Sequence, residues 1–262
     1  MGIVNVSPDS FHPGSRWPDP AAAVEAALRL ADEGAELLDL GAISTRPGAA
    51  VVSADEEQAR LLPVLRALRA QTDLPLTVDT SNATTARAAL DAGVDGINDI
   101  SAGTADPELL PLAAVHGCGL VLMHMQGTPA TMQNDPRYED VVAEVGAWLA
   151  ARADAAEAAG VARDRICVDP GIGFGKRLEH NLALLAKLPA IAAGRPLLLG
   201  ASRKSFIGAL TGAPVEARLP GSLAALAVAH AAGVTAVRVH DVAASRQFLA
   251  VLAAATGGTS AG

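Results

Sequence analysis

The sequence has few of the residues on which several classes of protein depend. Only 3% of its 262 residues are aromatic, and it contains two cysteines, Cys118 and Cys167. Two isolated cysteines cannot form a secreted disulfide framework or a CxxC metal site, so we interpret both as small buried hydrophobic residues. A core with so few rings must be built from Leu, Val, Ile and Ala, which suits helices packed on a sheet.

Basic residues and long apolar runs are also scarce. Twenty Lys and Arg against 28 Asp and Glu give a formal net charge of −8, which repels nucleic acid and anionic lipid surfaces. No apolar run is long enough to span a membrane, and the start MGIVNVSPDSF lacks the parts of a secretory signal. We therefore predict a cytoplasmic protein that binds neither nucleic acid nor membranes.

Short runs rich in Val, Ile and Leu alternate with amphipathic segments along the whole chain. The runs predict strands at 3–5, 37–41, 76–80, 96–100, 120–124, 166–170, 197–202 and 236–241. The intervening segments predict helices at 21–33, 55–70, 84–92, 107–115, 139–159, 178–191, 221–232 and 243–255. Eight β–α units in a chain of this length predict a single-domain (β/α)₈ TIM barrel over residues 1–262, with a frayed tail at 256–262.

Glycines mark the ends of the predicted helices. Gly34, Gly93, Gly117, Gly160 and Gly233 each follow a helical run, where a left-handed cap is commonly needed. By contrast, the loops after strands one, two, five, six and seven are polar and rich in Pro and Gly, which places function on that face of the barrel. Because the first strand starts at residue 3, we expect the start of the barrel to be truncated.

Polar residues stand at the end of every predicted strand. A single Asp or Asn there can simply cap the next helix, but eight strand ends together predict one pocket for a small anionic substrate. The residues are Asn5, Asp39, Asp79, Asn98, Asp99, His124, Asp169, Ser202, Arg203, Lys204, Arg238, His240 and Asp241.

Three segments add chemical detail to this pocket. The run DPGIGFGK, which begins at Asp169, is either a glycine-rich turn with an Asp cap or a loop whose main chain a ligand can approach. Its spacing excludes a P-loop, and no dinucleotide fingerprint is present. Two clusters of basic residues, one at Arg203 and Lys204 and one at Arg238 and His240, favour an anion site over isolated surface salt bridges.

The first two loops, at 5–11 and 44–48, combine polar side chains with Pro and Gly. They are interpreted as mobile lids, although either one alone fits ordinary loop chemistry. A Ser–His–Asp signature, His/Cys metal spacing and a close carboxylate pair are all missing. Covalent catalysis and structural zinc are therefore not expected.

Seven segments in order resemble the dihydropteroate synthase family over nearly the whole chain: GIVNVSPDSF, LLDLGAISTRPGA, LTVDTSNATTARAALDAGVDGINDISAG, VLMHMQGTPATMQ, CVDPGIGFGKRLEHNLALL, LLLGASRKSFIG and VRVHDV. The resemblance implies a transferase of folate biosynthesis. Such an enzyme joins 4-aminobenzoate to (7,8-dihydropterin-6-yl)methyl diphosphate, giving 7,8-dihydropteroate and diphosphate. It also implies Mg²⁺, competitive inhibition by sulfonamides and a homodimer formed by helices on the far side of the barrel.

The resemblance also assigns roles to residues by position. The pterin would be held by Asp79, Asn98, Ile100, Met123, Asp169, Phe174 and Lys204. The diphosphate would be held by Asn5, Thr45, Arg46, Arg238 and His240, with Asn5 also a ligand of Mg²⁺. Aminobenzoate would contact Phe11, Thr45, Arg46, Pro47, Phe174, Ser202 and Lys204. The catalytic residues would be Lys204, Asp79, Arg238 and His240.

Two loops depart from the family pattern. The first continues as Phe11-His12-Pro13-Gly14-Ser15 and so lacks one acidic residue of the family pattern, and the second has Ala42-Ile43 where the family has Gly-Glu. For the second change we predict a packing adjustment rather than lost activity. Two alternatives remain: an inactive pterin-binding paralogue, and a pterin-dependent methyltransferase, which would have no diphosphate for Arg46 and the segment 202–204 to bind.

Overall fold

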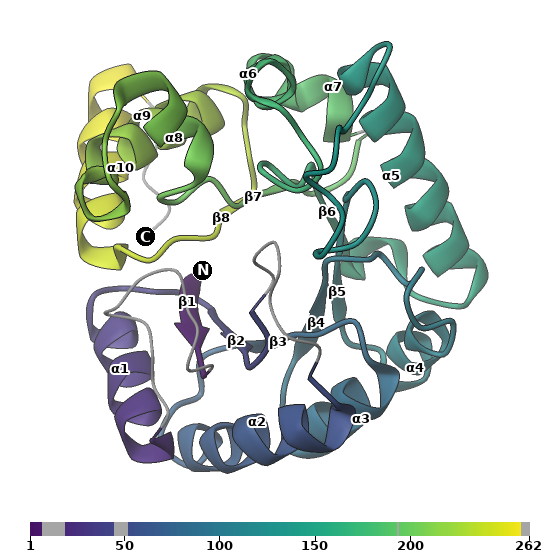
Figure 1. Ribbon diagram of the computed structural model, residues 1–262. Coiled ribbons are helices and arrows are strands. Elements are labelled where there is room, and N and C mark those ends of the chain that lie inside the picture. Colours follow the sequence, from purple (N-terminus) through teal and green to yellow (C-terminus); the bar gives the residue numbers. More distant parts are fainter. Residues whose placement is uncertain (7–18, 45–51, 193, 258–262) are drawn as a thin grey trace.

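The computed structural model describes residues 1–6, 19–44, 52–192 and 194–257. Strands and helices alternate throughout these ranges, with the strands around a central axis and the helices outside them (Figure 1). The strands are β1 Gly2–Asn5, β2 Leu38–Gly41, β3 Leu76–Asp79, β4 Gly96–Asp99, β5 Gly119–Met123, β6 Ile166–Asp169, β7 Leu198–Leu199 and β8 Ala236–Val237. The helices are α1 Pro20–Asp32, α2 Ala54–Arg69, α3 Ala83–Asp91, α4 Leu109–His116, α5 Val141–Ala158, α6 Leu178–Ala186, α7 Leu188–Ala192, α8 Ser205–Thr211, α9 Leu219–Ala231 and α10 Val242–Thr256.

The strands form a closed ring. Strands β1 to β6 pair in parallel in chain order, and β7 pairs with β8. Two parallel bridges join these sheets, Val168 to Leu197 on one side and Gly2 to Val239 on the other. Across the second bridge the Ile3 amide donates to the Val239 carbonyl at 3.1 Å. The predicted (β/α)₈ barrel is therefore confirmed.

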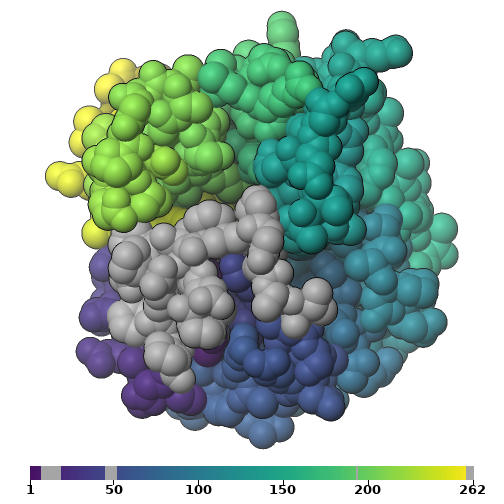
Figure 2. All heavy atoms as spheres, viewed as in Figure 1, coloured from purple at the N-terminus to yellow at the C-terminus, as the bar shows by residue number. Residues whose placement is uncertain are grey.

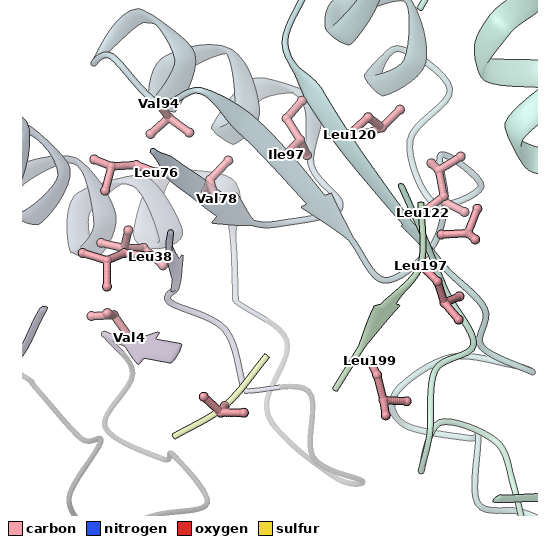
Figure 3. Close-up of a cluster of buried hydrophobic side chains, with 14 of the residues drawn as sticks. Val4, Leu38, Leu76, Val78, Val94, Ile97, Leu120, Leu122, Leu197 and Leu199 are labelled. Carbon is pink, nitrogen blue, oxygen red and sulfur yellow. The ribbon is translucent and has the colours of Figure 1, made fainter. Parts of the chain in front are cut away.

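The main hydrophobic core lies between the strands and the helices. Because side chains alternate along a strand, every second strand residue points outward onto the helix layer. The outward residues of the strands are aliphatic, as Figure 3 shows for Val4, Leu38, Leu76, Val78, Ile97, Leu120, Leu122 and Leu199, together with Val94 before β4 and Leu197 before β7. The residues between them face the barrel axis, and at the carboxyl ends of the strands these are polar. The alternation thus separates the core from the candidate site.

The structure corrects three boundaries. The helix predicted at 178–191 is two helices, α6 and α7, separated at Lys187. Pro189 explains the break, because its ring would clash with the carbonyl of Leu185 in a continuous helix. Helix α8 was not predicted as a separate element. Strands β7 and β8 are shorter than expected. Beyond them, side-chain contacts replace main-chain pairing, as where the His240 amide donates to Ser202 Oγ at 3.2 Å.

The predicted helix-capping glycines, Gly34, Gly93, Gly117, Gly160 and Gly233, all have positive φ, as expected. Helix α10 includes Thr256, and most of the predicted tail lies outside the described residues. No helix in the described part of the chain is long and apolar enough to cross a membrane.

Candidate active site

A cluster of charged residues joins four strand ends. Asp39 Oδ2 accepts hydrogen bonds from Arg238 Nε at 2.6 Å and from Asn98 Nδ2 at 3.0 Å, and its Oδ1 accepts from Thr77 Oγ1 at 2.5 Å. The other edge of the Arg238 guanidinium donates to Asp79 Oδ2 at 2.8 Å. The strand register aligns these groups, since Asp39 pairs with Thr77 on β3, and Asp79 pairs with Asn98 on β4. Arg238 therefore bridges two carboxylates across the barrel axis.

Burial controls the charge state of this cluster. Asp39 is completely buried. Burial raises the pKa of Asp79 to about 7, although Arg238 opposes the shift, while the nearby carboxylates of Asp39, Glu57 and Asp99 add to it. Burial would lower the pKa of Arg238, but the carboxylates of Asp39 and Asp79 keep it above its usual value. Asp79 is the group of this cluster that can exchange a proton near neutral pH.

A second cluster lies at the ends of β6 and β7. Asp169 Oδ1 accepts a hydrogen bond from the Gly171 amide at 2.7 Å. The ammonium group of Lys204 donates to the carbonyl of Ile172 and lies 4.6 Å from the centre of the Phe174 ring. Burial lowers the pKa of Lys204 to about 8, an effect that Asp169 opposes. Burial also raises the pKa of Asp169, against the effect of Lys204.

Gly200 brings the two clusters together. A β-carbon placed on this residue would lie 3.7 Å from Asp169 Oδ2, 3.9 Å from Lys204 Nζ and 4.0 Å from the Arg238 β-carbon. A side chain here would contact the Asp169 carboxylate, the Lys204 ammonium group and the base of the Arg238 side chain, so its absence keeps the region among them open. The predicted wall residue Met123 lies beside this space, since it is buried at the end of β5 and is the register partner of Asp169.

The structure places four further predicted residues at the same face. Ser202 Oγ lies 3.0 Å from Nδ1 of His240, so a residue assigned to aminobenzoate orients one assigned to diphosphate. Asn5 ends β1 and pairs in register with Gly41. Ile100 follows β4 and is half-buried.

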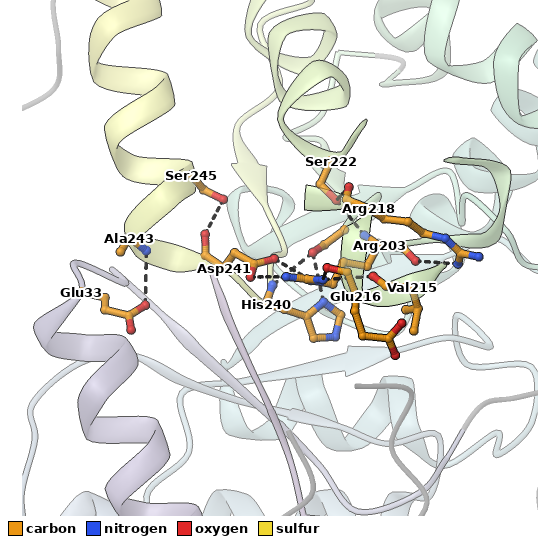
Figure 4. A network of polar contacts seen from close by, with 11 residues as sticks. Glu33, Arg203, Val215, Glu216, Arg218, Ser222, His240, Asp241, Ala243 and Ser245 are labelled. Carbon is orange, nitrogen blue, oxygen red and sulfur yellow. Dashed lines mark hydrogen bonds and ion pairs between the residues drawn. The ribbon is translucent and has the colours of Figure 1, made fainter. Parts of the chain in front are cut away.

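Other members of the predicted ring have structural roles instead. Arg203 donates to Asp241 from both Nε, at 2.8 Å, and Nη2, at 2.7 Å (Figure 4). Its remaining nitrogen donates to the carbonyls of Val215 and Glu216. Arg203 thus braces the segment after β7 against the end of β8 and is not a free cation for an anionic substrate. Asp99 likewise accepts from main-chain and hydroxyl groups in the following turn.

The loops after β5 and β6 are joined at this face, where their teal and green atoms adjoin in Figure 2. Gln133 Nε2 donates to the Gly173 carbonyl at 2.8 Å, and Tyr138 OH donates to the Gly175 carbonyl at 2.8 Å. These contacts hold in place the segment that carries Phe174.

Four predicted residues, Phe11, Thr45, Arg46 and Pro47, lie outside the described residues, as does the altered segment around Pro13. The second altered loop is described at its start. Ala42 is completely buried in the core, and its carbonyl accepts from Arg60 Nη1 at 3.2 Å. Ile43, which stands where the family has the carboxylate, is half-buried, and the packing adjustment stays a prediction.

A hollow of about 620 Å³ lies elsewhere, at the start of α5, and is lined by Arg137, Tyr138, Glu139, Asp140 and Glu144. Its three carboxylates do not suit an anionic substrate, and no predicted site residue lines it. The candidate site is therefore the space among the strand ends.

Sequence reasoning missed Asp39 as a site residue, although it was in the strand-end ring. The signal was a carboxylate within an otherwise apolar strand run. It also missed Lys176, which is 3% exposed and lies in the loop after β6.

Comparisons with known proteins identify the family of this chain. A family model described as "Pterin binding enzyme" matches residues 1–240. Dihydropteroate synthase of Synechocystis is 44% identical over 96% of this chain and 88% of its own. The structure of Yersinia pestis dihydropteroate synthase with a sulfonamide drug complex superposes with a TM-score of 0.94 at 40% identity, covering 98% of this chain and 94% of that one. The enzyme from Xanthomonas albilineans in complex with 7,8-dihydropteroate gives a TM-score of 0.88 at 45% identity, covering 99% and 94%.

Proposed function

The chain belongs to the pterin-binding enzymes, within the dihydropteroate synthases, and from this membership we propose which of its residues carry out the reaction. The protein is a transferase that condenses 4-aminobenzoate with (7,8-dihydropterin-6-yl)methyl diphosphate to give 7,8-dihydropteroate and diphosphate. The observation that carries the residue assignment is the space beside Gly200, which Asp169, Lys204 and Arg238 surround.

The pterin ring lies in this space. Its amino and ring N–H groups are donors, and Asp169 Oδ2 faces the space as an acceptor while Oδ1 is held by the Gly171 amide. Asp79 and Asn98 contact the ring from the opposite strands, and Met123, Ile100 and Phe174 form its apolar walls. The Lys204 ammonium, already beside the Phe174 ring, lies near the reacting part of the substrate.

The diphosphate binds toward Arg238 and His240. Without substrate, Arg238 is neutralised by Asp39 and Asp79, so an anion must compete with two carboxylates for it. Because Asp79 has a pKa of about 7, taking up a proton there frees one edge of the guanidinium for a phosphate oxygen. Ser202 keeps the His240 ring oriented for the same leaving group.

Mg²⁺ suits this site only together with the substrate. No group of three His, Cys, Asp or Glu in the described part of the chain could hold a metal. Mg²⁺ commonly uses one or two protein oxygens together with water and substrate phosphates, and Asn5 offers one such oxygen at the end of β1. A bound Mg²⁺ would neutralise negative charge on the diphosphate. Full activity is then expected to be lost with a chelator and recovered with Mg²⁺.

In the reaction, the aminobenzoate nitrogen attacks the methylene carbon of the pterin. A C–N bond forms, the C–O bond to diphosphate breaks, and the amine loses one proton. The residues orient the substrates and stabilise the leaving charge, with Arg238 and Lys204 as the described cations. No protein nucleophile is required. Ser202 and Lys204 lie where the aminobenzoate carboxylate is expected.

The decisive assay incubates the purified protein with both substrates and Mg²⁺ and measures dihydropteroate. Turnover is expected. Pterin binding with no product would indicate an inactive paralogue, and methyl transfer from a methylated pterin would indicate the methyltransferase alternative. The relatives from Synechocystis and Escherichia coli are dihydropteroate synthases, which favours the condensation.

Sulfonamides should compete with aminobenzoate for this protein. The support comes from the related Yersinia pestis dihydropteroate synthase, whose structure is of a sulfonamide drug complex. Raising the aminobenzoate concentration should restore the rate at a fixed sulfonamide concentration. Inhibition that does not depend on aminobenzoate would contradict a shared pocket.

A homodimer is supported by exposed apolar residues on neighbouring helices: Leu182 on α6, Leu210 on α8, Val228 on α9 and Val251 on α10 (Figure 1). We expect Val251→Asp to shift the mass measured by light scattering from dimer to monomer. Val115→Asp, on the distant α4, is the matched control. A monomeric wild-type protein would overturn the dimer. A cytoplasmic location remains a prediction.

A further inference from the structure

Lys176 has an unusual environment for a lysine. It is 3% exposed, and its ammonium group has three acceptors: His124 Nδ1 at 3.0 Å, the His124 carbonyl at 3.3 Å and the Phe174 carbonyl at 2.9 Å. An ammonium group has three N–H donors, so donors and acceptors match in number. In the described part of the chain it forms no ion pair with a carboxylate.

The histidine is suited to accept. Burial lowers the pKa of His124 to about 3, and the charge of Lys176 lowers it further, so the imidazole is neutral. Its ring packs edge-on against Trp148, with ring centres 4.9 Å apart. A neutral, fixed imidazole presents Nδ1 as a lone pair to the ammonium group.

The composition of the chain also distinguishes this residue. The sequence contains 17 arginines and only three lysines, at 176, 187 and 204. Lys187 is exposed at the end of α6, whereas the charges of Lys176 and Lys204 both act to lower the pKa of Asp169. A compact three-donor group fits between acceptors on two loops, which the planar guanidinium of arginine does not.

The three acceptors belong to two different segments. The His124 carbonyl directly follows β5, and the Phe174 carbonyl lies in the loop after β6. That loop also contains Ile172, the main-chain partner of Lys204, and Gly171, the main-chain donor to Asp169. A contact that fixes this loop therefore also fixes Asp169, the proposed acceptor for the pterin, and Phe174, a proposed wall of the pterin site.

We propose that Lys176 is a positioning residue for pterin recognition, which holds the loop after β6 against the end of β5 and so fixes Asp169 and Phe174. The proposal rests on the pterin-binding role of Asp169 described above. The group acts through its three hydrogen bonds and does not contact the substrate.

The protonation of Lys176 gives the proposal a distinctive signature. Burial lowers the pKa of Lys176 to about 7, with Asp169 opposing the shift and Lys204 adding to it. The titratable groups around it are His124, Asp169, Lys204 and, beyond the imidazole, Tyr138. When the ammonium loses a proton, one of the three donors is lost and the loop is held less firmly. Pterin affinity is therefore expected to fall above pH 7.

The test is calorimetry of 6-hydroxymethyl-7,8-dihydropterin with wild type, Lys176→Met and the matched control Lys187→Met between pH 6 and 8.5. We expect Lys176→Met to bind about tenfold more weakly than wild type at pH 6, and the difference to narrow by pH 8.5, where the neutral amine of wild type keeps two of its three donors. The control should match wild type throughout. Because Asp79 titrates in all three proteins and is not among the groups that shift the pKa of Lys176, its contribution cancels in the ratio of variant to wild-type affinity.

An unchanged affinity of Lys176→Met, or a ratio that does not vary with pH, overturns the positioning role. If the wild type binds no pterin, the assigned function itself fails, which is a different result. If Lys176→Met does not fold, lysine-selective NMR of the wild type decides. The three lysine signals allow Lys176 to be titrated with and without the pterin. Its pKa is expected to rise by about one unit on binding, the equivalent of tenfold coupling. An unchanged pKa overturns the proposal.

Discussion

At the scale of single residues, Asp39 shows how one buried carboxylate can organise a site. It accepts hydrogen bonds from Arg238, Asn98 and Thr77. Asp39→Asn keeps the shape of the side chain but removes the charge opposite Arg238. We expect a loss of unfolding free energy on the order of 3 kcal/mol, because breaking this buried ion pair leaves Arg238 with Asp79 as its one remaining carboxylate partner among the described residues. Urea denaturation measures it.

The control for this substitution is Asp91→Asn, which changes an exposed aspartate on α3. It should leave both the unfolding free energy and the activity within error of wild type. An Asp39→Asn protein as stable and active as this control would show that Arg238 does not depend on Asp39.

The raised pKa of Asp79 predicts a pH dependence of stability. Its pKa rises from 3.8 in the unfolded chain to about 7, chiefly because it is buried. Between these values the folded protein holds a proton that the unfolded chain releases, so its unfolding free energy falls as pH rises. The stability of wild type relative to Asp79→Asn should therefore drop by a few kcal/mol between pH 4 and pH 7. Denaturation series at several pH values measure this difference, and a constant difference would contradict the burial of a titrating carboxylate.

At the scale of elements, the loop after β6 depends on Gly171. This residue has φ +66°, and a β-carbon on it would lie 1.9 Å from the His124 carbonyl oxygen. Gly171→Ala must therefore displace the loop from the end of β5. We expect a tenfold or greater loss of pterin affinity by calorimetry, because the Gly171 amide orients Asp169.

Gly117→Ala is the matched control, since it has φ +59° and nothing within 4 Å of the added carbon. It should cost about 1 kcal/mol of stability from backbone strain and leave pterin affinity unchanged. Equal pterin affinities in the two variants would mean that the close contact of Gly171 does not shape the slot.

The elements also show what the sequence could and could not predict. Hydrophobic periodicity placed all eight strands, because their outward residues form one apolar layer. It could not detect the break at Lys187, since the apolar spacing continues past Pro189. Nor could it assign Arg203, because the sequence does not show that Asp241 is its partner. The positions of the strand ends predict which residues lie close together. Which of those residues form ion pairs or hydrogen bonds with one another depends on how their side chains pack in the folded protein.

At the scale of the whole molecule, the barrel has an uneven hydrogen-bond pattern. Strands β1 to β6 are joined by continuous ladders, whereas the pair β7 and β8 is attached at each side by a single bridge. We call these two junctions, Val168 to Leu197 and Gly2 to Val239, the seams of the barrel. The candidate site spans both seams, since Asp169 lies on one side of the pair β7 and β8, and Asp39 and Asp79 lie on the other. Arg238, which follows β8, already connects the pair to the far strands through its two ion pairs.

This arrangement predicts that the substrate stabilises the seams. Amides at the bridges, such as those of Ile3, Val168 and Val239, should exchange with solvent faster than the Ile97 amide in the continuous ladder, because a short junction opens locally at lower cost. Adding the pterin together with diphosphate should slow exchange at the bridges more than at Ile97, because the ligands contact both sides of each seam. Hydrogen exchange followed by NMR measures both effects. Equal protection of the bridge and ladder amides without ligand would mean that the ring of strands opens as one unit. Equal protection that persists with ligand would mean that ligand contacts do not hold the bridges closed.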